Sequence, residues 1–470
     1  MRRLGLGALA SFSPRLRPRV DPATLGIGIV HLGLGAFHRA HQAVYTEEAV
    51  AASGDRRWGI CGVSPRGSRA ADDLRRQDGL YTLFERGAGA AQPRIIGSVR
   101  RVLSAMGERD AVVAAVANAD AKVATLTVTE QGYAPGSDVV PLLCEGLRAR
   151  AQANGEPLTV LCCDNIPANG PFLRERVLAA CAGEAELSSW IDECVSFPSS
   201  VVDRIVPAQE VRDVDEASTL LGVADRCAIS AEPFSQWVIE DRFLAGRPAW
   251  EIAGAVMTTD ATPYQIAKLR LLNGAHSALA YLGALAGYEL IADAIEDTAF
   301  ERFLGLLMSQ EIAPTLTAPS ALNLAGYAET IRARFANRAL GHRCIQVCSD
   351  GTLKLPIRLL PSVRERLQAG APVRLLLLSI AAWMRFVATR RSDAGAPLAV
   401  VDPAADALLA RTRGAATPDA VVDRLLSFEQ VFDRELGTDA DVRRTLVGWL
   451  TLLEENGARA AALEATGADG

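Results

Sequence analysis

Histidine and lysine are scarce in this chain. Five histidines and three lysines, Lys122, Lys268 and Lys354, occur among 470 residues. No histidine is paired with a cysteine at the spacing that zinc sites use. The nine cysteines are odd in number and irregularly spaced, which argues against a disulfide framework and favours a reducing compartment. We therefore expect a cytoplasmic protein that binds no metal.

A basic surplus and long apolar runs are also missing. The formal net charge is -6, so the sequence does not predict the basic face that nucleic-acid binding needs. The apolar run at 375–384 is too short to cross a bilayer and is expected to form a buried helix. The amino terminus is too interrupted by glycine and arginine for a signal peptide, so residues 1–24 are interpreted as a flexible arm. We expect neither nucleic acid nor membrane as a partner.

Strand-like and helix-like segments alternate in the first half of the chain. Short apolar runs at 27–32, 58–63, 94–96, 123–128 and 158–163 are separated by Ala- and Leu-rich stretches. Strands separated by helices indicate parallel pairing in a doubly wound α/β sheet. From about Pro263 onward helical periodicity dominates and no strand series appears. We expect an α/β domain over 25–258 and a mainly α-helical domain over 259–470.

A glycine-rich turn follows the first apolar run. Gly33 permits a tight turn, and Gly35 lets the backbone approach a pyrophosphate at the start of the next helix, where exposed N–H groups favour negative charge. His38 replaces the third glycine of the G-x-G-x-x-G pattern, which makes the dinucleotide signal moderate by itself. Ala36, Phe37 and His38 complete the expected cofactor-binding turn.

The end of the second apolar run leaves the choice between NAD and NADP open. NAD-specific folds usually place a carboxylate there for the ribose hydroxyls. This sequence instead has Ser64, Arg66 and Arg69, with no carboxylate before Asp72. Arg66 or Arg69 would suit a 2′-phosphate, and an exposed loop arginine is an equally good interpretation. We predict NAD as the cofactor, with NADP as the alternative and with Ser64 and Arg66 as contacts.

The strongly helical stretch at 262–283 carries Lys268, Asn273 and His276. At about 100° per residue, Asn273 lies about 140° and His276 about 80° around from Lys268, so all three share one side. A lysine buried among aliphatic residues is expected to have a lowered pKa, as a general base for an alcohol proton requires. Taken singly, each residue has a structural alternative: a snorkelling lysine, a helix-interior asparagine or a hydrogen-bonded core histidine.

Seven segments together resemble the polyol-specific long-chain dehydrogenases, the family of the mannitol dehydrogenases and the fructuronate reductases (D-mannonate oxidoreductases). They are GLGAFHRAHQA at 33–43, LTVTEQGY at 126–133, CDNIPANG at 163–170, SFPSSVVDRIVP at 196–207, EPFSQWVIEDRF at 232–243, KLRLLNGAHSALAYLG at 268–283 and DGTLKLP at 350–356. The resemblance extends from residue 25 to the end. It implies a Rossmann-type first domain, a helical second domain and hydride transfer between NAD(P) and a small sugar acid or polyol.

The resemblance also implies roles for individual residues. Lys268 would be the general base, Asn165 and Asn273 would stabilise the reacting oxygen, and His276 would orient the substrate. The remaining positions would be Asp203 and Lys354 in the substrate site, Glu130 beside a proton path and Thr129 beside the cofactor. A lysine and two carboxamides supply this chemistry without a metal. The structural alternatives are an ion pair of Asp203 with Arg204, a turn role for Asn165 and a cap role for Glu130.

Residues 342–346 bear on the substrate. The fructuronate reductases resemble this chain in a His-Arg pair three residues before a glutamine, here His342, Arg343 and Gln346, whereas mannitol dehydrogenases tend to have arginine at the last position. Arg343 would bind a carboxylate with both nitrogens, which favours D-fructuronate and D-mannonate; an ion pair with Asp350 is the alternative. The competing functions are a mannitol or arabinitol 2-dehydrogenase acting on a neutral ketose and a non-catalytic nucleotide-binding regulator. We expect a monomer or a small homo-oligomer.

Overall fold

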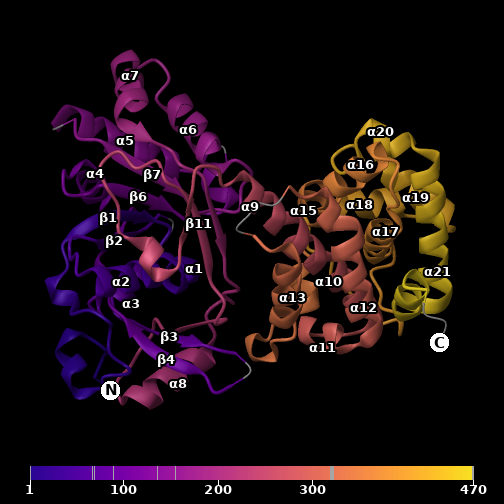
Figure 1. The fold of residues 1–470 in the computed structure, drawn as a ribbon, viewed down its shortest axis with the longest axis horizontal. Helices are drawn as coiled ribbons and strands as arrows, with labels where there is room; N and C mark the ends of the chain where they lie inside the picture. The colour runs from indigo at the N-terminus through magenta and orange to yellow at the C-terminus, as the bar shows by residue number, and fades with distance from the viewer. Residues whose placement is uncertain are drawn as a thin grey trace. The chain divides into compact units, whose positions relative to one another are not determined.

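The computed structural model describes residues 2–65, 67, 69–87, 89–134, 136–153, 155–317 and 322–467, with the backbone but not the side chain of Glu130 (Figure 1). The chain divides into two compact units, Met1–Gln265 and Ile266–Gly470. Unit 1 is an α/β unit with a parallel sheet, and unit 2 is helical. The expected fold class is therefore confirmed.

A six-stranded sheet forms the centre of unit 1. Its strands, in spatial order, are β5 (Val99–Ser104), β2 (Gly59–Ser64), β1 (Ile27–Leu32), β6 (Val123–Leu126), β7 (Leu158–Cys162) and β8 (Val195–Ser196). Every neighbouring pair is parallel. The inner strands are almost wholly buried because helices or further strands cover both faces, which is why they appear in the sequence as short continuous apolar runs.

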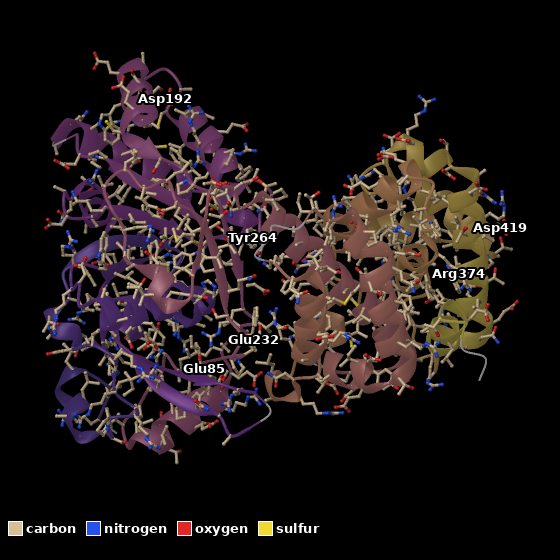
Figure 2. The ribbon with its side chains drawn as sticks, in the orientation of Figure 1. Glu85, Asp192, Glu232, Tyr264, Arg374 and Asp419 are labelled. Carbon is tan, nitrogen blue, oxygen red and sulfur yellow. The ribbon has the colours of Figure 1, made fainter. Side chains whose placement is uncertain are left out.

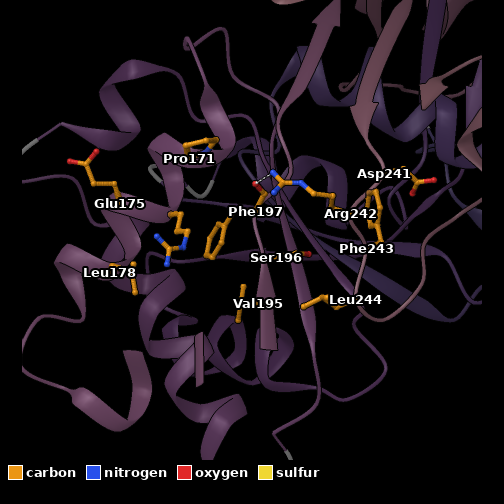
Figure 3. A pocket seen from close by; sticks show the side chains of 11 residues that line it. Pro171, Glu175, Leu178, Val195, Ser196, Phe197, Asp241, Arg242, Phe243 and Leu244 are labelled. Carbon is orange, nitrogen blue, oxygen red and sulfur yellow. Dashed lines mark hydrogen bonds between the residues drawn. The ribbon is translucent and has the colours of Figure 1, made fainter. Parts of the chain in front are cut away.

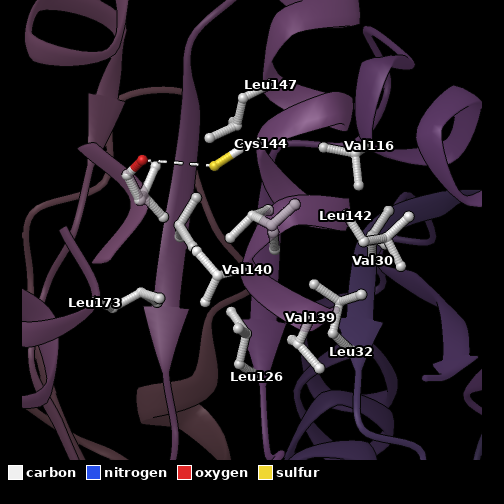
Figure 4. Close-up of a cluster of buried hydrophobic side chains, with 14 of the residues drawn as sticks. Val30, Leu32, Val116, Leu126, Val139, Val140, Leu142, Cys144, Leu147 and Leu173 are labelled. Carbon is white, nitrogen blue, oxygen red and sulfur yellow. Dashed lines mark hydrogen bonds between the residues drawn. The ribbon is translucent and has the colours of Figure 1, made fainter. Parts of the chain in front are cut away.

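Successive residues of the strands face two separate cores. Val30 and Leu32 of β1 pack with one group of helices, whereas Ile29 packs on the opposite face. The first core lies under α4 (Arg109–Ala117), α5 (Val139–Ala153), α6 (Asn169–Ala180) and α7 (Ala185–Cys194), and part of it is drawn in Figure 4. The second core includes residues of α2 (Gln42–Ser53) and α3 (Arg69–Arg75). The sheet is therefore doubly wound, as the sequence predicted.

Two three-stranded sheets complete unit 1, and the sequence did not predict them. One has the order β10 (Ile229–Ala231), β3 (Tyr81–Glu85), β4 (Gln92–Ile96), and the other the order β12 (Val256–Thr258), β11 (Gln236–Glu240), β9 (Ser200–Asp203). The run at 94–96 was expected in the parallel sheet, but as part of β4 it pairs antiparallel with β3. Helix α8 (Val211–Leu221) precedes β10.

The amino-terminal segment is folded, which corrects the expectation of a flexible arm over residues 1–24. Leu4, Ala8 and Phe12 are buried against Leu80 and Ile95. The segment contains two short 3-10 helices, η1 (Leu6–Ser11) and η2 (Pro22–Thr24). The apolar residues that make the sequence look like a weak signal peptide are the ones that pack, because they cover one side of the β3–β4 sheet.

Unit 2 consists of helices in the part of the chain that the structure describes. A long helical stretch begins with α9 (Thr262–Ala267) and continues as η5 (Lys268–Gly274) and α10 (Ala275–Ala286). The further helices are α11 (Ile291–Glu296), α12 (Thr298–Leu306), η6 (Leu307–Ile312), α13 (Leu324–Phe335), α14 (Cys344–Val347), α15 (Gly351–Arg358), α16 (Leu360–Gln368), α17 (Arg374–Thr389), α18 (Ala405–Thr412), α19 (Pro418–Leu426), α20 (Arg434–Thr438) and α21 (Ala440–Ala465). The run at 375–384 is the buried centre of α17, as predicted. None of the described helices is long and apolar enough to span a bilayer.

Candidate cofactor and active site

The glycine turn after β1 has the geometry that a bound phosphate group requires. Gly33 has a φ of 108°, and a Cβ there would lie 2.1 Å from the carbonyl oxygen of Thr127, so a side chain is excluded. Gly35 is exposed and has an ordinary φ, and a Cβ there would have only one neighbour, the oxygen of Gly33 at 3.8 Å. Nothing within unit 1 therefore demands glycine at this position, and the space is open to a ligand. This turn fits a dinucleotide phosphate.

The next residues of the turn divide between surface and core. Ala36 and Phe37 are half-buried at the start of α1 (Ala36–Ala40). His38, an expected cofactor contact, is fully buried, and its ring stacks on His31 with 3.4 Å between the ring centres. Burial lowers the pKa of His38 well below its usual value, so its ring is neutral. The His38 side chain therefore packs under the turn, because it lies one helical turn beyond the exposed Gly35.

The cofactor contacts expected after β2 and β6 are placed in part. Ser64 ends β2, is half-buried and donates a hydrogen bond to the carbonyl of Gly67 at 2.5 Å. Arg66 and the side chain of Glu130 lie outside the described residues. Thr129 is exposed just beyond β6 and has a φ of 61° and a ψ of 173°, a backbone conformation that is nearly confined to glycine.

Asn165 and Asp203 stand at the carboxyl ends of two strands of unit 1. Asn165 is exposed and follows β7 after Asp164, whereas Asp203 is buried at the end of β9. The neighbouring Arg204 forms an ion pair with Glu85 at 2.5 Å and donates to the carbonyl of Glu232 at 2.9 Å. Glu85 and Glu232 are labelled in Figure 2. The ion pair that the structure shows for Arg204 is thus with Glu85.

The helix that carries Lys268 departs from α geometry. Residues 268–274 form a π-helix, in which the backbone bonds run to the fifth residue, and such segments are frequent at functional sites. The angular spacing expected from α geometry therefore does not hold for Asn273 and His276. Lys268 is buried. Asn273 Oδ1 and His276 Nε2 are buried and have no hydrogen-bond partner among the residues that the structure describes. Buried atoms of this kind are available to a bound polar group.

Positively charged side chains surround His276 in unit 2. The His276 ring stacks on Phe335 with 4.6 Å between ring centres, and the His342 ring meets it edge-on at 4.9 Å. Burial lowers the pKa of His276 well below its usual value, and the positive charges of Arg358, Arg334 and Lys354 act in the same direction. His276 is therefore neutral and can donate or accept one hydrogen bond at each ring nitrogen.

Lys354 has neutral hydrogen-bond partners inside unit 2, and the carboxylates of Asp350 and Asp402 also act on its charge. Its Nζ donates to the carbonyl of Val347 at 3.2 Å and lies 3.3 Å from Ser349 Oγ. Burial, and next the charge of Arg358, lower the pKa of Lys354 to about 8. Arg358 in turn donates to Ser277 Oγ at 3.1 Å. The structure thus brings Lys354, His342 and His276 near one another in unit 2.

Arg343 and Gln346, by contrast, are exposed at the surface of unit 2. The Arg343 guanidinium is exposed and forms an ion pair with Glu289 at 2.9 Å. Gln346 is exposed, and its Oε1 accepts from the Arg343 backbone N–H at 3.3 Å. The ion pair that the structure shows for Arg343 is therefore with Glu289 and not with Asp350, the alternative that the sequence offered. The bridge between Leu290 and Arg343 explains this, because it places Glu289 beside the guanidinium.

A cavity of about 620 Å³ in unit 1 is lined by none of the site residues that the sequence predicted (Figure 3). It is lined by α6, by β8 and by residues 241–244, and Arg242 donates to the carbonyl of Phe197 in its wall. Strand β8 pairs with the first residues of β7, whereas Asn165 follows the last, so the cavity belongs to the opposite end of the strand. The described residues contain no group of three or more His, Cys, Asp or Glu side chains suited to hold a metal ion.

Comparisons with known proteins cover nearly the whole chain. The family profile of the mannitol dehydrogenase Rossmann domain matches residues 27–252, and that of the mannitol dehydrogenase C-terminal domain matches residues 260–450. The D-mannonate oxidoreductase of Escherichia coli (strain K12) is 40% identical and covers 95% of this chain and 97% of its own length. A mannitol 2-dehydrogenase of Neosartorya fischeri is 35% identical, with 88% of each chain covered. The solved ternary complex of Pseudomonas fluorescens mannitol 2-dehydrogenase with NAD and D-mannitol has a TM-score of 0.87 at 32% identity and covers 98% of this chain and 99% of that one.

Proposed function

Because the chain belongs to the mannitol dehydrogenase family, we propose that it interconverts D-mannonate and D-fructuronate with NAD as the hydride acceptor. The protein is an oxidoreductase that acts on CH–OH groups with NAD. In the forward direction a secondary alcohol loses a hydride to NAD and a proton to the protein, and a ketone forms. NADP is the alternative cofactor, since the sequence after β2 has Arg66 and lacks the carboxylate that NAD-specific folds usually have there.

The observation that carries the choice of a sugar acid is the accumulation of positive charge around His276. Arg358, Arg334 and Lys354 all act on that imidazole, and burial strengthens such interactions. A carboxylate beside Lys354 would be stabilised by these charges, whereas a neutral ketose would gain no charge-assisted bond. In this assignment Lys354 and Arg358 recognise the acid group. Arg343 and Gln346 are left out because the Arg343 guanidinium already pairs with Glu289.

Each proposed step uses a residue of this chain. Lys268 accepts the proton of the reacting hydroxyl as its general base. The carboxamides of Asn165 and Asn273 donate to the reacting oxygen, which stabilises its developing charge. His276, neutral in its buried setting, donates to or accepts from a neighbouring substrate hydroxyl. Asp203 binds further hydroxyls, Glu130 passes the proton from Lys268 to solvent, and residues 33–38, Ser64 and Thr129 bind the cofactor. No metal is required for these steps.

A mannitol-type reaction on a neutral ketose is the second candidate. Two observations favour it: the solved relative at a TM-score of 0.87 holds D-mannitol, and the hydrogen-bond partners of Lys354 in this chain are neutral. A non-catalytic nucleotide-binding regulator would not need the buried Lys268, and no observation favours it.

A substrate panel tests the proposal. Initial rates of NADH and NADPH oxidation are measured with D-fructuronate, D-fructose and L-ribulose under the same conditions. We expect kcat/KM for fructuronate to exceed that for fructose by about tenfold or more, which corresponds to one charge-assisted hydrogen bond. Faster turnover of fructose would replace the first candidate with the second. No turnover of any of the three substrates with either cofactor would reject both.

A further inference from the structure

The side chain of Asp164 accepts three hydrogen bonds from the neighbouring loop at residues 127–133. Asp164 is buried directly before Asn165, at the carboxyl end of β7. Its Oδ1 accepts from the backbone N–H of Thr129 at 2.8 Å, and its Oδ2 accepts from the N–H of Val128 at 3.1 Å and from the Tyr133 hydroxyl at 2.6 Å. All three are donors, so both oxygens of the carboxylate must be acceptors.

The loop that Asp164 holds has a backbone that needs support. Thr129 has a φ of 61° with an extended ψ, a combination that β-branched residues avoid. The loop is also tightly packed, because a Cβ on Gly132 would lie 2.4 Å from Val128 Cγ2. A conformation of this kind persists only when surrounding contacts fix it. The two backbone hydrogen bonds to Asp164, donated by the amides of Val128 and Thr129, are contacts of that sort directly before the Thr129 α-carbon.

This loop begins where the strand order of the large sheet reverses. From β1 the chain proceeds to β2 on one side, whereas β6 lies on the other, and dinucleotides bind at the carboxyl ends of strands at such a point. Thr127 continues β6, and its hydroxyl donates to the carbonyl of Gly33 at 2.9 Å. The loop therefore lies against the glycine turn in which a Cβ has no room.

Asp164 is itself firmly anchored. Its carbonyl accepts from Asn169 Nδ2 at 3.0 Å, and the same nitrogen donates to the carbonyl of Ser200 on β9 at 2.9 Å. The backbone N–H of Ile166 bonds to the Asp164 carbonyl as well, at 2.9 Å. The backbone of Asp164 is therefore fixed within the turn that presents Asn165, while its carboxylate is bonded to the loop at Thr129.

We propose that Asp164 is a positioning residue that fixes the Val128–Thr129 backbone against the glycine turn and so holds the cofactor crevice and the adjoining Asn165 in one arrangement. The proposal rests on the proposed function for the role of Asn165, but its effect on cofactor binding does not depend on the sugar substrate. Asp164 acts through the backbone of its neighbours and takes no part in proton or hydride transfer.

The test compares Asp164→Asn with a matched variant, Asp225→Asn. Asp225 is also a buried aspartate of unit 1, and it accepts from the backbone N–H groups of Thr82 and Cys227 and from Gln77 Nε2. In either variant the new amide group can accept at only one of the two oxygen positions. NADH affinity is measured by fluorescence titration, turnover by initial rates, and hydrogen exchange over residues 127–133 by mass spectrometry.

We expect Asp164→Asn to raise the NADH dissociation constant about tenfold and to lower kcat about 100-fold, as small displacements of positioning contacts do. Exchange over 127–133 should accelerate. Asp225→Asn should leave NADH affinity and kcat within about twofold, because its contacts lie at β3 and β10, away from the carboxyl ends of β6 and β7. Equal effects of the two variants on NADH affinity and kcat would overturn the proposal.

If Asp164→Asn does not fold, a second variant tests the proposed role of Asp164. Tyr133→Phe removes one of the three donors and keeps both backbone bonds, so NADH binding should weaken in the same direction by about threefold. No change in NADH affinity in that case would overturn the proposal. If the wild-type protein turns over none of the sugars, the proposed function fails, and the NADH titration still decides the role of Asp164.

Discussion

The carboxamide of Gln265 holds both ends of the turn that follows Asn165, with its Nε2 donating to the carbonyl of Ile166 at 2.6 Å and its Oε1 accepting from the N–H of Ala168 at 2.9 Å. Ala168 has a φ of 47°, in the left-handed region that residues other than glycine rarely adopt. Gln265 therefore stabilises the turn, and it does so from the helix that carries Lys268 three residues later.

Replacement of Gln265 by glutamate should reduce turnover. The carboxylate can still accept from Ala168 but cannot donate to Ile166, and its charge would face a carbonyl oxygen. We expect kcat to fall about tenfold or more through misplacement of Asn165, with a smaller change in NADH affinity. Gln209→Glu is the control, because Gln209 Nε2 also donates to two backbone carbonyls of unit 1, those of Arg226 and Ala228. Equal losses of kcat in the two variants would argue against the role of Gln265.

Lys268→Met should abolish most of the activity. Loss of a general base costs about 100- to 10,000-fold in rate. The control is Lys122→Met, since Lys122 forms an ion pair with Glu156 at 3.5 Å in unit 1. Initial rates at the pH optimum of the wild type measure the effect. Turnover by Lys268→Met at the wild-type level would mean that another group takes the proton.

The affinity for a sugar acid should fall as the pH rises through about 8. Burial lowers the pKa of Lys354 to about 8, so its charge is complete at pH 7 and mostly gone at pH 9. We expect KM for fructuronate to rise over this interval, whereas KM for a neutral ketose rises much less. Lys354→Arg should shift the rise beyond the measured range, because a guanidinium keeps its proton. The same pH profile for both substrates would show that Lys354 does not recognise the acid group.

Arg343→Gln should have little effect on KM for the sugar acid. Its guanidinium pairs with Glu289 at an exposed position, and such surface pairs contribute about 0–1 kcal/mol to stability. We expect KM to change by less than about twofold, the change that 0.4 kcal/mol represents. A selective rise of KM for fructuronate, with KM for fructose unchanged, would return Arg343 to the carboxylate-binding group.

Acid should destabilise the protein through its buried histidines. Burial lowers the pKa of His31 from 6.5 to about 3, so the folded state stays neutral while the unfolded state gains a proton. This contribution to stability is complete above pH 6.5 and is lost progressively from there towards pH 3. Between pH 7.5 and 5.5, urea unfolding of His31→Asn should lose about 1.4 kcal/mol less than that of the wild type. Equal losses in the two proteins would show that the imidazole becomes charged while folded.

The sequence predicted four of the six strands of the parallel sheet, β2, β1, β6 and β7, because these strands are buried on both faces, and it missed β5 and β8. Residues 27–32 are strand β1 as expected, and the other runs in this sheet are displaced by one or two residues at an end. Strands such as β12 were missed because three residues, Val256–Thr258, are too few to show a period. The π-helix was missed because nothing in its composition distinguishes it from an α-helix, and the angular argument for Asn273 failed with it.

For the candidate site, the sequence was a better guide to the chemical type of a side chain than to the residues that this side chain contacts. The scarcity of lysine drew attention to Lys268 and Lys354, which are a buried and a largely buried residue of unit 2. Arg343 was chosen for its chemistry, but Glu289 is 54 residues away in sequence and their pairing depends on a long-range bridge. Asp164 and Gln265 act on backbone atoms of distant turns, which no spacing in the sequence reveals.

The π-helix η5 limits how the length of this helical stretch can be changed in redesign. A single-residue deletion within 268–274 would let ordinary α bonding resume and would bring Lys268 and Asn273 one position closer along the helix, whereas a single-residue deletion within 275–285 would rotate every later position of that helix by about 100°. Residues 275–285 are buried on all sides, so such a deletion would drive alanine-sized and leucine-sized groups into each other's places. Loop grafts elsewhere can vary in length, whereas here the number of residues is as much a part of the design as their identity.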